Sequence, residues 1–297
     1  MLVLLLNLFI FIGCSSSSKT TKPIVSVSTF AIYDITKNIA GSSIELVNIL
    51  PAGVSPHSFE PTPKLMAKIE KSSLVIFSGG LEPWTSAFHF KHNTLNISQY
   101  VTLRKLHKNE EHEEHESHHH KGSFDPHYWL NIENMKKATK IITQKLIEVA
   151  PKNKTLYEKN EKTYLSMLEK LEKDFDTSLK ECKYDTLVSN HNAFSYIASR
   201  YNFKTATLSG LSPQSMPSPK KIVQLMKRIK KDNIKTIFFE SFANEKVIRS
   251  IAHDTKINVD VLHPLGNITA TQLKNNESYE KIMRENLSKI SKALQCQ

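Results

Sequence analysis

The sequence predicts an α/β protein with two lobes, each a mainly parallel sheet flanked by helices, joined by one long helix. Short β-branched runs alternate with amphipathic helical patterns in both halves of the chain, which is typical of parallel sheets. Between the halves, residues 153–180 carry one continuous apolar stripe at helical spacing. A length of 297 residues is sufficient for two domains, each with its own core.

The N-terminal half begins with a strand, a helix and a strand. Apolar runs predict strands at residues 24–28, 45–50 and 74–77, and helical spacing predicts helices at 32–40 and 63–71. In parallel sheets, ligands bind beyond the carboxyl ends of the strands. His57 follows the second strand in a proline-rich loop, so it lies in a favoured place.

Two helices are predicted in the middle of the chain, at residues 133–149 and 153–180, with Pro151 ending the first. The second would be roughly 40 Å long at 1.5 Å per residue, enough to run the height of two small domains. We therefore assign residues 14–150 to an N-terminal lobe, 151–181 to a linking helix and 182–297 to a C-terminal lobe.

The C-terminal half repeats the alternation of strands and helices. The predicted strands are 186–190, 204–208, 236–240 and 258–262, and the predicted helices are 193–201, 219–231, 244–255 and 277–294. His191 and His263 each follow one of these strands directly.

The first thirteen residues are almost entirely apolar and precede Cys14. This segment is short for a membrane span and resembles a lipoprotein signal peptide, after whose removal Cys14 carries the lipid. No Lys or Arg precedes the apolar run, and Phe11 replaces the usual Leu, so an ordinary secretory signal or short anchor stays an alternative. Either interpretation exports the chain, and we expect it in the periplasm or at the cell surface, membrane-anchored by lipid at Cys14.

Export leaves Cys182 and Cys296 in a compartment that permits disulfides. One lies just before a predicted strand and the other at the end of the last helix. The sequence is compatible with a disulfide between these two cysteines and with two independent free thiols.

The formal net charge is +11, but the lysines are spread over predicted helices and interleaved with Glu. No aromatic and basic cluster gathers them, so we interpret them as solvated helix faces and expect no nucleic-acid partner. We expect a monomer.

Residues 107–121 form a polar loop rich in histidine. Alternating Glu and His, with no apolar side chain, cannot bury a core. Six imidazoles in fourteen residues favour weak contacts with transition metals over one fixed site, although a plain surface insertion is the alternative. The six are His107, His112, His115, His118, His119 and His120.

Four other histidines are candidates for one tight metal site: His57, His127, His191 and His263. His127 lies between Pro126 and two aromatic residues, directly after the histidine-rich loop. Any one of the four could be a buried structural histidine. Two from each lobe, at strand ends facing one cleft, favour a shared metal ion between the lobes.

Several motifs carry a family resemblance: Pro-His57-Ser-Phe-Glu-Pro-Thr-Pro, Gly79-Gly-Leu-Glu-Pro-Trp84, Asp-Pro-His127-Tyr-Trp-Leu, His191-Asn-Ala-Phe and Pro264-Leu-Gly. In this order, the chain resembles the zinc- and manganese-binding proteins of bacterial ABC importers, most of all the ZnuA type. The resemblance implies two lobes joined by a long helix. It also implies a metal ion held in the cleft and delivered to a membrane permease driven by a cytoplasmic ATPase.

The chain departs from that family at three positions. Asn192 and Ser78 replace a common Asp and a common Asn, and neither change removes a ligand. His263 occupies a position where many relatives carry Asp. We expect His263 to be the fourth ligand, with a site of three histidines and a water as the alternative. An all-nitrogen site favours Zn²⁺ over Mn²⁺, which prefers more carboxylate oxygen.

Two other functions use the same ligands. An exported metal-dependent hydrolase needs a bound water and a general base, for which Glu60 is near His57, but no His-Glu-x-x-His or nucleophile-elbow motif is present. A surface lipoprotein that buffers zinc or attaches to a host without a transporter is the other alternative.

Overall fold

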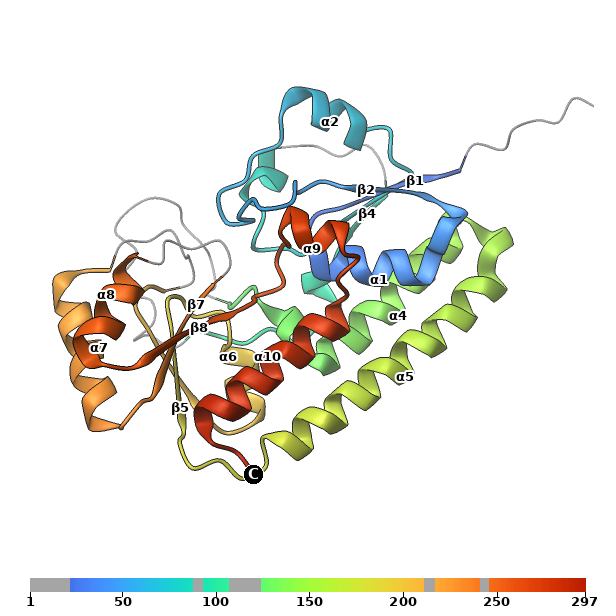
Figure 1. Ribbon diagram of the computed structural model, residues 1–297. Helices are drawn as coiled ribbons and strands as arrows, with labels where there is room; N and C mark the ends of the chain where they lie inside the picture. Colours follow the sequence, from blue (N-terminus) through green and yellow to red (C-terminus); the bar gives the residue numbers. More distant parts are fainter. Residues whose placement is uncertain (1–21, 88–92, 107–123, 211–216, 241–245) are drawn as a thin grey trace, which may run out of the picture.

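The computed structural model describes residues 22–87, 93–106, 124–210, 217–240 and 246–297 (Figure 1). Two four-stranded sheets, one in each half of the chain and each wholly parallel, confirm the predicted fold class. The first sheet contains β1 Ile24–Val27, β2 Glu45–Asn48, β3 Leu74–Phe77 and β4 Thr94–Asn96, in the order β2-β1-β3-β4. The second contains β5 Thr186–Ser189, β6 Lys204–Thr207, β7 Thr236–Glu240 and β8 Asn258–Leu262, in the order β6-β5-β7-β8.

Nine α-helices are described around the two sheets. They are α1 Phe30–Ala40, α2 Pro63–Ile69, α4 Ile132–Val149, α5 Lys154–Ser178, α6 Ser195–Arg200, α7 Pro219–Lys231, α8 Lys246–Thr255, α9 Ala270–Lys274 and α10 Tyr279–Leu294. Short 3₁₀ helices include η4 Tyr128–Leu130 and η5 Pro151–Asn153. Within the described ranges, no helix combines the length and apolar character that a membrane crossing requires.

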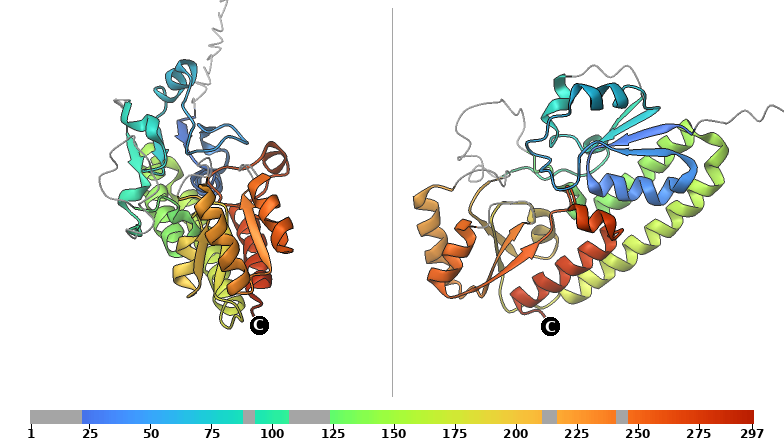
Figure 2. Two further views of the ribbon diagram at one scale, coloured as in Figure 1. Left: turned by 90° about the vertical axis from the view of Figure 1, so that its left-hand side faces the viewer. Right: turned by 45° about the horizontal axis from the view of Figure 1, so that its top comes forward.

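Side chains alternate between the two faces of each sheet, because successive residues of a strand point to opposite sides. Leu74 and Ile76 of β3 join the large core with α1, whereas Val75 packs against α2. In the C-terminal lobe, Leu187 belongs to the core shared with α10, and Val188 packs in the cluster that includes α7 and α8. Figure 2 shows the two lobes from two further directions.

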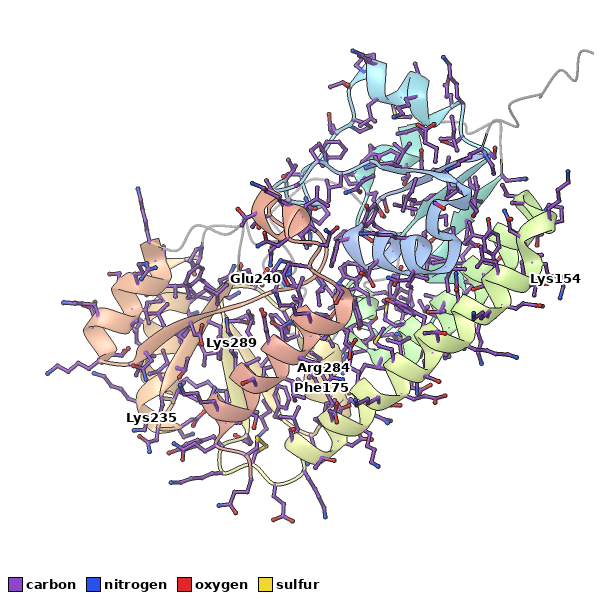
Figure 3. The ribbon with its side chains drawn as sticks, turned by 45° about the vertical axis from the view of Figure 1, so that its right-hand side comes forward. Lys154, Phe175, Lys235, Glu240, Arg284 and Lys289 are labelled. Carbon is purple, nitrogen blue, oxygen red and sulfur yellow. A yellow bond between two sulfur atoms is a disulfide. The ribbon has the colours of Figure 1, made fainter. Side chains whose placement is uncertain are left out.

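The long helix α5 runs from the N-terminal lobe to the start of β5 (Figures 1 and 3). Its apolar stripe is buried, as the sequence pattern predicts; the stripe comprises Tyr157, Tyr164, Leu168, Leu171 and Phe175. The Tyr164 hydroxyl donates to Asp34 of α1 at 2.8 Å. At the other end, Asp174 pairs with Arg284 of α10.

One core extends through both lobes. It contains side chains of β1 and α1 from the first lobe, of α4 and α5, and of β5, β8 and α10 from the second. A disulfide joins Cys182, just after α5, to Cys296, just after α10. Because separating the lobes would expose this shared apolar surface to water, the fold resists wide opening.

Candidate metal centre

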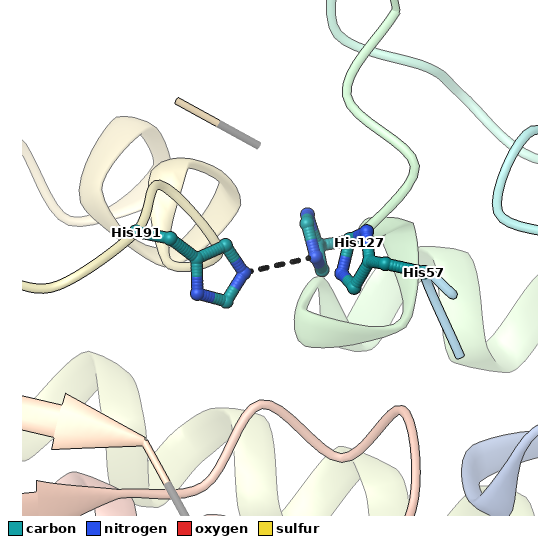
Figure 4. A group of neighbouring side chains, drawn as sticks. All are labelled: His57, His127 and His191. Carbon is teal, nitrogen blue, oxygen red and sulfur yellow. Dashed lines mark hydrogen bonds between the residues drawn. The ribbon is translucent and has the colours of Figure 1, made fainter. Parts of the chain in front are cut away.

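Three of the four candidate histidines meet between the lobes (Figure 4). His57 comes from the loop after β2, His127 from the residue before η4, and His191 from the second residue after β5. One ring nitrogen from each histidine lies within 4.8 Å of the corresponding nitrogens of the other two. The ring centroids are 5.2 to 5.7 Å apart.

His127 is fixed by the aspartate two residues before it. Asp125 Oδ1 accepts from the backbone N–H of His127 at 2.9 Å and from its ring Nδ1 at 2.8 Å. Asp125 is itself 1% exposed; its carboxylate accepts from the Ser195 hydroxyl and its backbone carbonyl from Tyr196. With Nδ1–H bound to a carboxylate, the Nε2 lone pair of His127 is directed to the metal centre.

His191 has the same kind of support from the C-terminal lobe. Its Nδ1 contacts the carboxylate of Glu240, the last residue of β7, and both side chains are buried. Strands β5 and β7 are neighbours in the sheet, so their carboxyl ends bring this histidine and this glutamate together. The Nε2 of His191 is therefore also left to bind an ion.

His57 differs from the other two in its surroundings. It is only partly buried, and in the described part of the chain no carboxylate accepts a hydrogen bond from its ring. Desolvation lowers the pKa of His57 well below its usual 6.5, and the nearby His127 and His191 lower it further. The ring is therefore neutral at pH 7, which is the form that binds a metal.

The spacing of His127 and His191 fits a single ion. Their Nε2 atoms lie 3.4 Å apart (Figure 4). Two nitrogens that each bind one tetrahedral ion at 2.0 to 2.1 Å are about 3.3 to 3.4 Å apart, so the two rings hold the positions of two ligands.

A small cavity adjoins the three rings. Its volume is about 20 Å³, room for a water molecule or an ion. Residues of both lobes line it: Ser55, Pro56, His57, His127, Trp129, His191, Glu240, Pro264, Gly266 and Asn267. Figure 3 labels Glu240 near the junction of the lobes.

The structure does not bring His263 together with the other three histidines. This histidine is not part of the group, and both of its ring nitrogens have other partners. Nδ1 accepts from the backbone N–H of Leu265 at 3.1 Å, and Nε2 lies 3.2 Å from Gln272 Oε1. Leu265 has a positive φ of 59°, so His263 stabilises the sharp turn that follows β8.

The remaining candidate residues lie outside the described part of the chain. These are Cys14 and the histidines of the loop, His107, His112, His115, His118, His119 and His120.

Sequence reasoning missed the two supporting carboxylates. The sequence shows that a lone acidic residue, Glu240, ends the apolar strand Thr236-Ile-Phe-Phe-Glu240. That this strand lies beside the one preceding His191 is known only from the structure. Asp125 stood inside the motif that contains His127, and its spacing of two residues suits a turn in which the side chain bonds to the backbone.

Residues 25–293 match the family model described as zinc-uptake complex component A, periplasmic, or ZnuA. The chain belongs to the ZnuA family. A high-affinity zinc uptake system protein, ZnuA of Bacillus subtilis (strain 168), is 31% identical over 287 residues, covering 94% of this chain and 90% of that protein.

Two pneumococcal comparisons agree with this family assignment. The zinc-binding lipoprotein AdcA of Streptococcus pneumoniae R6 is 30% identical over 290 residues, and the alignment spans 94% of this chain but 57% of AdcA. The crystal structure of the Zn(II)-bound ZnuA-like domain of S. pneumoniae AdcA superposes with a TM-score of 0.77 at 28% identity, covering 92% of this chain and 99% of the domain. This ZnuA-family chain therefore spans little more than half the length of AdcA.

Proposed function

We propose that this chain is an exported zinc-binding protein that captures Zn²⁺ and delivers it to an ABC permease driven by a cytoplasmic ATPase. The observation that carries the proposal is the pair of buried histidines whose Nε2 atoms are 3.4 Å apart and whose Nδ1 atoms are held by carboxylates. Membership of the ZnuA family and the zinc-binding names of its relatives support the same function.

Zinc is the cargo that suits this set of ligands. Three imidazoles provide nitrogen ligands, whereas Mn²⁺ favours sites richer in carboxylate oxygen. We propose that water fills the fourth position, because His263 is bound elsewhere. The two buried carboxylates, Asp125 and Glu240, offset the charge of the ion without binding it directly.

The local chemistry favours binding over hydrolysis. Of the described residues that line the cavity, Glu240 is the one carboxylate, and it contacts His191. Glu60, our sequence candidate for a general base, is exposed and does not line the cavity. A cavity volume of about 20 Å³ suits a single ion.

For export, we propose a lipid anchor at Cys14, which lies outside the described residues. The histidine-rich loop, residues 107–121, is proposed as an auxiliary collector of zinc. Neither proposal is needed for the tight site.

A growth experiment tests the transport function. A strain of the source bacterium that lacks this gene should fail to grow when zinc is removed by a chelator, and grow normally when zinc is restored. The full gene should rescue growth, and the His127→Ala gene should not. Normal growth of the deletion strain under chelation would instead favour a zinc-buffering or adhesive lipoprotein that works without a transporter.

The supporting carboxylates provide a second prediction. Glu240→Gln keeps the size of the side chain but removes the charge that orients His191, and loss of such a partner typically costs about 10- to 100-fold in metal affinity. We expect a loss of this size in zinc titrations with a competing chelator. Glu82→Gln is the matched control, because Glu82 is also buried but accepts from Ser28, Ser78 and Gly79, none of which lines the cavity. Equal zinc affinity in Glu240→Gln and the parent would remove the proposed role of Glu240.

A further inference from the structure

The segment after β8 crosses from the C-terminal lobe to the N-terminal lobe. We call residues 264–268 the clasp loop. Its carbonyls accept three hydrogen bonds from the other lobe: Pro264 O from Trp129 Nε1 at 2.7 Å, Gly266 O from the Phe30 N–H at 3.1 Å, and Ile268 O from the Gly53 N–H at 2.8 Å. The clasp loop thus connects the C-terminal lobe to the segments that carry His57 and His127.

Asn267 makes the most specific contact of the clasp loop. Its side chain is 1% exposed, and its Nδ2 donates to both Pro51 O and Val54 O at 2.7 Å. Its Oδ1 accepts from the Ile268 N–H at 2.8 Å. One buried carboxamide therefore holds the turn, Pro51 to Val54, that ends three residues before His57.

Gly266 shows how closely the clasp loop approaches the same turn. A Cβ atom at this position would lie 3.1 Å from Pro56 Cγ and 3.6 Å from a ring carbon of Trp129. Pro56 precedes His57, and the ring centroid of Trp129 lies 5.6 Å from that of His127. The clasp loop is in contact with the immediate neighbours of two ligands.

His57 is the ligand that depends on this contact. His127 and His191 are oriented by Asp125 and Glu240, but no such carboxylate holds the His57 ring among the described residues. The position of His57 is therefore determined by the path of its loop, and the clasp loop of the other lobe holds that loop through hydrogen bonds.

We propose that Asn267 is a positioning residue for His57, and that moving the clasp loop withdraws His57 and speeds the release of the metal ion. This inference rests on the proposed function in zinc delivery. A displacement of the C-terminal lobe, which carries His191, would then loosen His57 of the opposite lobe through the same motion. Release would require a shift of a few residues and no wide opening of the shared core.

The test measures zinc dissociation from the full mature chain by stopped flow, with an excess of a chromogenic chelator. Asn267→Ala should still bind one zinc ion at the tight site but release it about tenfold faster, the lower end of the effect of losing an outer-shell partner. The matched control is Asn160→Ala, which also removes a side-chain amide that donates to a backbone carbonyl, Ile39 O, but does so away from the site. Its dissociation rate should equal that of the parent.

A double-mutant cycle separates positioning of His57 from general weakening of the fold. In a His57→Ala background, Asn267→Ala should have no further effect on zinc dissociation, because its target is gone. An unchanged rate in Asn267→Ala, or an equal acceleration with and without His57, would overturn the inference. Failure of the parent chain to bind zinc at all would instead overturn the proposed function.

Amide hydrogen exchange provides a measurement that needs no variant and so remains decisive if Asn267→Ala does not fold. Zinc should slow the exchange of the Gly53 N–H, which donates to the clasp loop, and leave the Val25 N–H of the central strand β1 unchanged. Equal exchange of Gly53 with and without zinc would show that the clasp loop is not coupled to the ion.

Discussion

His127→Ala is expected to weaken zinc binding by more than the roughly 100-fold that is the upper range for losing an outer-shell partner, since it removes a side chain that we propose as a direct ligand. The same change also leaves Asp125 buried without its histidine. The measurement is the dissociation constant in competition with a chelator of known affinity, with the folded state of the metal-free variant verified by circular dichroism.

His263→Asn is the control for this prediction. Asparagine places an oxygen near the position of Nδ1 and so retains an acceptor for the Leu265 N–H. We expect zinc affinity to be essentially unchanged, because His263 does not belong to the histidine group. If His263→Asn weakened zinc as much as His127→Ala, the fourth ligand would be His263 after all, and the turn after β8 would have to rearrange on binding.

Most of the helices and strands could be predicted from the sequence alone. The strand pattern Leu74-Val-Ile-Phe77 and the apolar stripe of α5 depend on local periodicity, which is visible in one chain without any alignment. Two short elements, β4 and α9, were not predicted, because three residues and five residues are too few to establish a period. Their positions depend on contacts with the rest of the fold.

The metal centre was predictable only in part. Position after a strand selected His57 and His191, which the structure brings together, and also His263, which it does not bring to them. His263 differs because its two ring nitrogens contact other residues. Nδ1 contacts Leu265 in the loop that follows β8, and Nε2 contacts Gln272 in α9. Strand-end position determines which edge of the sheet a residue occupies, whereas the path of the next few residues determines where its ring points.

The same reasoning explains why carboxylates were harder to assign than histidines. Glu240 and His191 are separated by 49 positions and meet because β5 and β7 are adjacent in the sheet. The order of strands in a parallel sheet cannot be predicted from the sequence pattern of any one strand. A prediction of Glu240 as a supporting residue therefore required the sheet order as well as the sequence.

The stability of the metal-free protein should depend on pH through His263. Burial lowers the pKa of His263 from its usual 6.5 to about 4. Protonation would also require Nδ1 to lose the hydrogen bond that it accepts from Leu265. Between pH 6.5 and 4 the unfolded chain therefore binds a proton at this residue that the folded chain does not. Folding stability from this residue is fully present above pH 6.5 and is lost as pH falls toward 4.

The expected size of this loss is about 3 kcal/mol, at 1.36 kcal/mol for each unit by which the pKa differs between the two states. Urea unfolding at several pH values gives the free energy of unfolding of the parent and of His263→Asn. The difference between the two proteins isolates the contribution of His263, because the titration of other groups cancels. The free energy of unfolding of the parent, minus that of His263→Asn, should be largest at pH 7. It should decrease by about 3 kcal/mol between pH 7 and pH 4. If the His263→Asn curve ran parallel to the parent, His263 would have a normal pKa in the folded protein, and its buried hydrogen bond to Leu265 would not control the turn.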